Sequence, residues 1–241
     1  MTKAKAARRN DSAQAVRATP GGTPSAARSV NATAYDALKE MITQGQLRPG
    51  VKLIHQDLAE RLQVSRTPVR EALERLFQEG LVTRIPRRGF YVAEIDEDEA
   101  RELYELREAL ETYALRRSLA RGIRAADLRR LDGFTRDYKA LVRDGATRER
   151  MSVDRDWHMA LASLADNRAL LRSLAAVFER LIMKIRTDGY RTVRGTEALL
   201  EHEQMMKALR SEDGAAAERL LAQHIQGARR RLVSHLAELA R

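Results

Sequence analysis

The sequence contains no cysteine, which excludes disulfide scaffolds, metal sites with thiolate ligands and thiol nucleophiles. Any metal site in this chain must therefore use histidine and carboxylate ligands. Aromatic residues make up only 5% of the chain, and alanine, leucine, arginine and glutamate are frequent, which favours helices over a β-sandwich. No apolar run is long enough to span a bilayer, so we expect no membrane association and a location in the cytoplasm.

Acidic residues are outnumbered: 34 Asp and Glu stand against 44 Lys and Arg in 241 residues, a net charge of +10. Such an excess attracts polyanions such as nucleic acid or anionic lipid. Half of it lies in residues 1–32, which lack an apolar period and are rich in Ala, Ser, Gly and Pro. We predict a disordered basic tail there, either simply solvated or in contact with phosphates. Its basic, acid-poor composition also leaves an organelle presequence open.

Residues 33–93 have the element order of a winged helix-turn-helix. Apolar spacing predicts three helices and then two strands, at about 35–44, 56–62, 67–76, 81–85 and 89–93. Pro68 suits the first turn of the third helix, where Ser65 or Thr67 is expected to cap exposed amides.

Residues 94–241 are predicted to be an antiparallel helical bundle. The first helix begins at the acidic residues 96–99 and ends at Gly122. Five more are expected at about 125–143, 148–165, 168–187, 195–211 and 214–240, with breaks at Gly145, Asn167, Gly189 and Gly214. The predicted fold class is thus mainly α: an N-terminal winged helix-turn-helix with a small β-hairpin, joined to an all-α bundle.

Arginines gather where a helix-turn-helix meets DNA. Arg66, Thr67 and Arg70 lie in the first turns of the predicted recognition helix, which enters the major groove. Arginine can bind guanine O6 and N7 with both arms of its fork, and threonine can contact phosphate or a thymine methyl group. Arg87, Arg88 and Gly89 form the hairpin tip, which we expect at the minor groove or the backbone. A solvated basic face is the alternative.

The segments LAERLQVSRTPVREALERLFQEGLV and PRRGFYV, within 58–92, resemble the amino-terminal signature of GntR-type bacterial transcription regulators. The resemblance covers about 33–93. It implies that Arg66, Thr67, Arg70 and Gly89 contact double-stranded DNA.

Three of the five histidines lie on apolar helix stripes. Asp154 and His158 are four residues apart, so their side chains can converge, and His202 and His224 lie on two other predicted helices. Buried carboxylates and imidazoles are costly without partners, and one shared partner would satisfy all four. Such a set suits Zn²⁺, Ni²⁺, Mn²⁺ or Fe²⁺ with positions left open for a ligand. His235 is expected at a helix edge.

The segments DRDWH, LLEHEQMMKAL and AERLLAQHI resemble the FCD ligand-binding domain of the FadR subfamily, in its metal-binding form. The resemblance implies that Asp154, His158, His202 and His224 are the metal ligands. An arginine in an LYELR-like motif of that family is associated with the effector pocket, which points to Arg107. A structural salt bridge from Arg107 to a glutamate is an equally open interpretation. We expect Asn167 to be a helix cap.

The leading functional hypothesis is a metabolite-responsive transcription regulator, a homodimer that binds a palindromic operator and responds to a small organic acid. A metal-dependent helical-bundle enzyme fused to a DNA-binding module is the alternative, because an open metal could activate water. An architectural DNA binder is a third class, which the basic tail would suit. No acid or base near the four residues can be named as a proton shuttle, so we predict no enzymatic activity.

Overall fold

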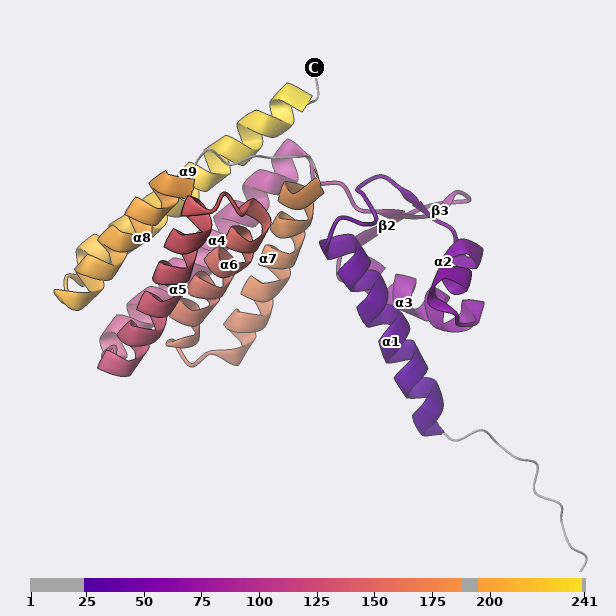
Figure 1. Cartoon of the computed structure of the whole chain (residues 1–241), viewed down its shortest axis with the longest axis horizontal. Helices are drawn as coiled ribbons and strands as arrows, with labels where there is room; N and C mark the ends of the chain where they lie inside the picture. The colour runs from indigo at the N-terminus through magenta and orange to yellow at the C-terminus, as the bar shows by residue number, and fades with distance from the viewer. Residues whose placement is uncertain (1–23, 188–194, 240–241) are drawn as a thin grey trace, which may run out of the picture.

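The computed structural model describes residues 24–187 and 195–239, which form a head and a helical bundle (Figure 1). The elements of the head are α1 (Pro24–Thr43), β1 (Lys52–Leu53), α2 (His55–Leu62), α3 (Arg66–Gln78), β2 (Val82–Ile85) and β3 (Gly89–Val92). Those of the bundle are α4 (Glu97–Arg121), α5 (Ala125–Arg143), α6 (Thr147–Ser163), α7 (Arg168–Thr187), α8 (Gly195–Arg210) and α9 (Gly214–Leu239). The predicted fold class is confirmed.

Helix α1 starts earlier than the sequence pattern suggests. It begins at Pro24, whereas residues 24–32 were predicted to belong to the tail. Proline is well tolerated in a first turn, where its missing N–H has no helical partner to lose, and alanine-rich sequence has a high helix propensity. The rest of the predicted tail, residues 1–23, lies outside the described residues.

Helices α2 and α3 form the helix-turn-helix pair. Gln63 ends α2 with a left-handed φ of 55°, which turns the chain toward α3. Leu58 and Leu73 from the two helices are buried in the head core. Ser65 occupies the N-cap position of α3, but its side chain makes no capping hydrogen bond, contrary to our expectation. Ser65 and Thr67 are exposed, so solvent can reach the first amides of the helix instead.

The wing is a three-stranded antiparallel sheet in the order β1-β3-β2. Leu53 faces Phe90 across β1 and β3, and Val82 faces Val92 across β2 and β3. The sequence pattern did not predict β1, because a strand of two residues has no visible alternation. Gly89 has a φ of 99° at the hairpin turn, a conformation that favours glycine.

The six bundle helices match their predicted ranges to within two residues. Asp96 caps α4 by accepting a hydrogen bond of 2.8 Å from the amide of Glu99. Asn167 accepts one of 3.1 Å from the amide of Leu170 and is therefore a cap, but it caps the start of α7 and not, as the sequence suggested, the end of the preceding helix. The predicted break at Gly189 falls outside the described residues. Among those described, every helix is too short or too polar to span a membrane.

The bundle touches the head through α7, which lies beside α1 (Figure 1). Nζ of Lys39 on α1 lies 2.9 Å from the carboxylate of Glu179 on α7. The next residue, Arg180, pairs with Glu99 at the start of α4. It also lies against Gly80, where an added Cβ would be 2.6 Å from its Nη1. The two domains are therefore connected by side-chain contacts as well as by the chain that leads into α4.

Candidate functional site

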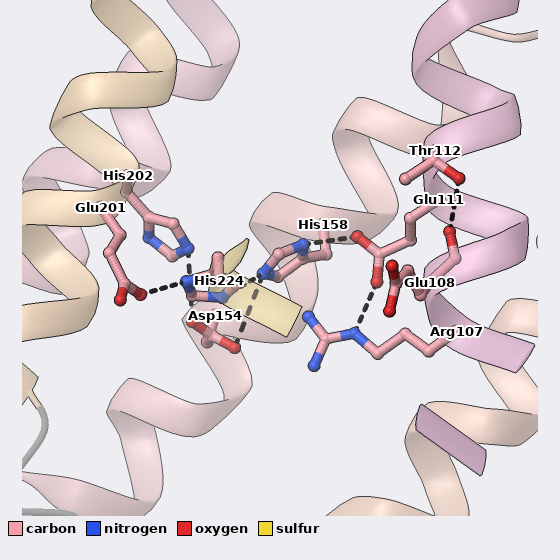
Figure 2. Close-up of polar contacts among 9 residues, drawn as sticks. All are labelled: Arg107, Glu108, Glu111, Thr112, Asp154, His158, Glu201, His202 and His224. Carbon is pink, nitrogen blue, oxygen red and sulfur yellow. Dashed lines mark hydrogen bonds and ion pairs between the residues drawn. The ribbon is translucent and has the colours of Figure 1, made fainter. Parts of the chain in front are cut away.

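Four side chains from three helices converge inside the bundle. Asp154 and His158 lie one turn apart on α6, His202 comes from α8 and His224 from α9 (Figure 2). One ligand atom from each lies within 4.8 Å of the others, and all three imidazoles are buried. The structure thus brings together the four residues that the sequence predicts as metal ligands.

The distances within this cluster suit a single small cation. Nε2 of His158 lies 3.1 Å from Nε2 of His224, and Nε2 of His202 lies 3.5 Å from Oδ1 of Asp154. Two ligands bound to one Zn²⁺ at about 2.0–2.1 Å are roughly 3–3.4 Å apart when their angle is near 90–110°. Nε2 of His158 lies 3.9 Å from Oδ2 of Asp154, and the whole set lies within 4.8 Å, so some side chains must move closer to share one ion.

Two glutamates orient the imidazoles. Nδ1 of His158 lies 2.6 Å from Oε2 of Glu111, and Nδ1 of His224 lies 2.7 Å from Oε2 of Glu201 (Figure 2). If both carboxylates are ionised and both imidazoles are neutral, each Nδ1 donates and each Nε2 keeps its lone pair. In that tautomer the two lone pairs would face each other across 3.1 Å, an arrangement that a shared cation would stabilise.

Sequence reasoning missed both glutamates. Glu201 lies next to His202, and Glu111 lies one turn after Arg107, on the same inward stripe of α4. That i, i+4 spacing from an inward arginine was the signal available for Glu111.

Burial and mutual proximity set the charge of the cluster. Burial, followed by the neighbouring imidazoles of His202 and His158, lowers the pKa of His224 well below its ordinary value. Burial opposes the ionisation of Asp154, but the three imidazoles and Arg107 outweigh it and lower the pKa of this carboxyl group. At neutral pH the cluster therefore presents neutral imidazole at His224 and an ionised carboxylate at Asp154, the protonation states that a metal ion requires.

Trp157, the only tryptophan in the chain, covers one side of the cluster. Its ring stacks on the imidazole of His202, with centroids 4.5 Å apart and an angle of 12° between planes. The side chain is buried. Its fluorescence therefore reports directly on the environment of a candidate ligand.

Arg107 extends from α4 toward Asp154 and His158 (Figure 2). Its Nε donates a hydrogen bond of 2.5 Å to Glu111, and its Cζ lies 4.5 Å from the ring centroid of Phe178. Its Nη2 is buried and has no hydrogen-bond partner among the described residues. The structural ion pair with a glutamate is thus present, and the effector-binding role of Arg107 stays a prediction.

Arg107 also lines a cavity of about 90 Å³, which adjoins the cluster at Asp154 and His224. Helices α4 to α9 all contribute to the wall. A single water needs only about 15 Å³, so there is room for a small organic molecule. Two further arginines line the cavity, Arg150 and Arg231, neither of which sequence reasoning singled out. Arg231 is two helical turns after His224 on the same face of α9, and that spacing could have identified it.

The predicted DNA-contacting residues are exposed on the head. Arg66 and Arg70 lie one turn apart at the start of α3, with Thr67 between them. Arg87 and Arg88 are exposed in the turn between β2 and β3, followed by the half-buried Gly89. His235, on α9, lies outside the four-residue cluster, as expected.

Two family models match this chain. The model described as bacterial regulatory proteins, gntR family, matches residues 31–92, and the FCD domain model matches residues 102–227. The first match covers the head, and the second contains Arg107 and all four residues of the cluster.

Characterised relatives carry the names of transcription regulators. The chain is 32% identical to the Nta operon transcriptional regulator of Aminobacter aminovorans over 193 residues, covering 77% of this chain and 86% of the relative. It is 29% identical over 201 residues to the HTH-type transcriptional repressor RspR of Escherichia coli K12, covering 82% and 86%. Both names are those of transcription regulators, so the relatives favour a regulator over the enzyme alternative.

Solved structures share the fold. E. coli McbR/YncC superimposes with a TM-score of 0.71 at 23% identity, covering 88% of this chain and 99% of that one. A GntR transcriptional regulator from Rhodococcus sp. RHA1 gives a TM-score of 0.70 at 25% identity, covering 86% and 98%. The arrangement of head and bundle is therefore one that experimental structures also contain.

Proposed function

This chain belongs to the GntR family of bacterial regulatory proteins and carries an FCD domain, and we propose that it is a metabolite-responsive repressor of the FadR subfamily. In this proposal a homodimer binds a palindromic operator, because two copies related by a two-fold axis present identical recognition helices to a symmetric site. Arg66, Thr67 and Arg70 contact the major groove. Arg87 and Arg88, at the wing turn opened by Gly89, contact the backbone or the adjacent minor groove.

The proposed cofactor is a divalent metal ion held by Asp154, His158, His202 and His224. Three observations support it: the convergence of four ligand atoms, the approach of Nε2 of His158 to Nε2 of His224, and the glutamates beside Nδ1 of these rings. A set of three imidazoles and one carboxylate suits Zn²⁺, Ni²⁺, Mn²⁺ or Fe²⁺. When bound, such an ion supplies open coordination positions and positive charge beside Arg107.

The proposed effector is a small carboxylate that binds in the cavity. Arg107 supports this assignment, because its buried Nη2 lacks a hydrogen-bond partner among the described residues and a carboxylate would provide one. The guanidinium already donates through Nε to Glu111, so its orientation is fixed before an effector arrives. An oriented donor loses less rotational freedom on binding than a flexible one.

We propose that the heads of the dimer can adopt two arrangements, one of which fits the operator better. An effector can alter operator affinity only if the protein binds the effector more tightly in one arrangement than in the other. Two helices connect the cavity to the head. Helix α4 carries Arg107 and follows directly after the wing. Helix α7 presents Phe178 to the cavity and Glu179 to Lys39 of the head, so a shift of this turn reaches both. We propose that both helices transmit the response.

The observation that carries this proposal is the position of Arg107, between the ligand cluster and the cavity on a helix that leads from the wing. The test uses an operator selected from random DNA with the purified protein and a small carboxylate found by thermal shift. Arg107→Ala should keep operator affinity and lose the response to the carboxylate. Arg107→Lys should restore it only in part, because an ammonium group lacks a bidentate fork.

Arg101→Ala, on the exposed side of the same helix, is the matched control and should respond like the wild type. The measured quantity is the ratio of operator affinities with and without the carboxylate. A wild-type ratio in Arg107→Ala would show that the effector anchors elsewhere. A collapse of operator binding itself would show that Arg107 supports only the fold or the dimer.

A further inference from the structure

We propose that helix α4 forms the contact between the two subunits of the homodimer, and that it packs antiparallel against α4 of the second copy across a two-fold axis between Ala109 and Leu110. The inference rests on the proposed function, because it requires the homodimer, and it adds where the two copies meet. It comes from an exposed stripe of α4 whose apolar residues and charges are arranged symmetrically about that midpoint.

The middle of the stripe is apolar. Leu106 and Tyr113 are 47% and 50% exposed, although both side chains are large and apolar. Ala109, between them, is exposed and Leu110 is half-buried. These four residues follow one another at spacings of three or four, so they lie on one side of the helix. Single exposed apolar side chains are ordinary, but a continuous stripe of them is typical of a contact surface.

A charge of opposite sign stands at each end of the stripe. Glu102 lies four residues before Leu106, and Arg117 lies four residues after Tyr113, so both charges are on the same side of the helix. Both charged residues are exposed. Nε of Arg117 donates a hydrogen bond of 2.7 Å to the carbonyl oxygen of Ala165, which holds this side chain against the bundle. The stripe therefore has an acidic end, an apolar middle and a basic end.

These two charges differ from their neighbours on the same helix. Glu105 and Arg116 both form ion pairs with residues of α9. Among the described residues, Glu102 and Arg117 form no ion pair with a side chain of opposite charge. A charged group from a second molecule can therefore pair with each of them without breaking an ion pair of this chain.

The stripe is complementary to itself. Leu106 and Tyr113 are equally far from its midpoint, and so are Glu102 and Arg117. In an antiparallel pair of copies related by a two-fold axis at that midpoint, Leu106 contacts Tyr113 of the partner subunit, and Glu102 pairs with Arg117 of the partner subunit. The symmetry makes each contact occur twice. A parallel pair would instead place each charge beside its own copy, and such like-charge contacts are unfavourable. The charges therefore favour a second copy in the antiparallel direction.

The opposite side of the same helix carries the proposed effector arginine. Arg107 follows Leu106 directly, but it points into the bundle and is only 3% exposed. The start of α4 follows the wing strand β3 after a short connection. A shift of α4 that accompanies effector binding at Arg107 would therefore change the packing of the two copies, and with it the spacing of the two heads. In this arrangement one helix connects the cavity, the dimer contact and the head.

Cysteine cross-linking of the full-length protein tests this arrangement directly, because the chain contains no cysteine of its own. Ala109→Cys and Leu110→Cys each place one thiol per subunit within about 1 Å of the two-fold axis, measured along the helix. Both variants should form a disulfide-linked dimer under mild oxidation, since facing residues of two packed helices come within the distance that a disulfide requires. Arg101→Cys, on an exposed side of the same helix, is the matched control. Its two copies would be roughly 25 Å apart, so it should stay unlinked on a non-reducing gel.

Charge reversal provides a second measurement. Glu102→Arg and Arg117→Glu should each raise the dissociation constant of the dimer about tenfold or more, because the symmetry turns two attractive pairs into two repulsive ones. The double variant Glu102→Arg, Arg117→Glu restores opposite charges and should recover most of this loss, which a structural role of either residue alone would not allow. Analytical ultracentrifugation measures the constant. Arg129→Glu, on the exposed face of α5, is the control and should keep the wild-type value.

A dimer in which Ala109→Cys and Leu110→Cys cross-link no better than Arg101→Cys would overturn this inference, leave the proposed homodimer standing and assign the stripe to a different partner. Failure of the double charge reversal to recover the dimer stability that the single variants lose would also overturn it. A wild-type chain that stays monomeric with and without the selected operator would instead overturn the homodimer of the proposed function, and this inference with it.

Discussion

Glu111 holds His158 by the ring nitrogen that points away from the ligand cluster, with Oε2 2.6 Å from Nδ1. Its other oxygen accepts a hydrogen bond from Nε of Arg107. One buried carboxylate therefore connects the arginine of the cavity to a candidate metal ligand. Any movement of Arg107 changes the hydrogen bonding of His158, so effector binding and metal binding are expected to be energetically coupled.

Glu111→Gln tests this connection. The amide keeps the shape of the side chain but removes the negative charge that fixes the proton on Nδ1 of His158. Loss of such an outer partner typically lowers metal affinity about 10- to 100-fold, and we expect a decrease in that range. The measurement is competition with a metal chelator of known affinity. Glu105→Gln, on the exposed side of α4, should retain wild-type affinity, and unchanged affinity in Glu111→Gln would show that this carboxylate does not tune the site.

The ligands themselves can be tested by metal content. His202→Ala and His224→Ala should each lower metal occupancy, measured by mass spectrometry, and lower the melting temperature of metal-loaded protein, because binding to the native state stabilises it. Binding of Ni²⁺ should also change the fluorescence of Trp157, which stacks on His202. His235→Ala, on α9 outside the cluster, is the control. Full metal content in an Asp154→Ala, His158→Ala double variant would contradict the site.

The lowered pKa of His224 predicts how the metal-free protein responds to acid. The unfolded chain takes up a proton at this imidazole near its ordinary pKa of about 6.5, whereas the folded chain does so only at lower pH. The unfolded state thus binds more protons, and the free energy of unfolding should fall as pH decreases below about 6.5, by up to about 1.4 kcal/mol per pH unit. Urea unfolding of chelator-treated protein between pH 7.5 and 5.5 measures this slope. His224→Gln should flatten it, and an identical slope in that variant would rule out His224 as the cause.

The recognition helix has its own test. Arg66→Ala and Arg70→Ala should each weaken binding to the selected operator by about 1–3 kcal/mol if the contact is to a base edge. Binding to random DNA should change much less, since that depends on phosphate contacts. Arg129→Ala removes an equal charge from the exposed face of α5 and serves as the control. Wild-type operator affinity in both head variants would reject the assignment of α3.

The fold was largely predictable from local patterns. The bundle helices follow from apolar spacing and from breaks at residues such as Gly122, and the structure reproduces their ranges closely. The clear differences lie where local pattern is weak. Strand β1 has only two residues and exists through its pairing with β3, and α1 extends back to Pro24 through a segment without an apolar period.

The candidate site was predictable only in part. Asp154 and His158 share a helix face, so their convergence follows from spacing, and the place of His202 and His224 beside them was predicted from their apolar stripes together with the family resemblance. Glu111 and Arg150 could not be identified in that way. Many glutamates and arginines occur on these helices, and which of them turn inward is decided by how the helices pack, not by the sequence around each one.

The turn of α7 from Phe178 to Ile182 contacts the head on one side and lines the cavity on the other. Glu179 and Arg180 contact Lys39 and Gly80 of the head, while their neighbours line the cavity. Exchange of either domain alone is therefore expected to disrupt the contacts between the head and the bundle. A chimera that grafts a foreign head onto this bundle would present Glu179 and Arg180 with side chains selected for another partner. Such a hybrid should bind its DNA and its ligand, but the ligand should no longer change its affinity for DNA. Introducing Lys and Gly at positions 39 and 80 of the foreign head should restore this effect.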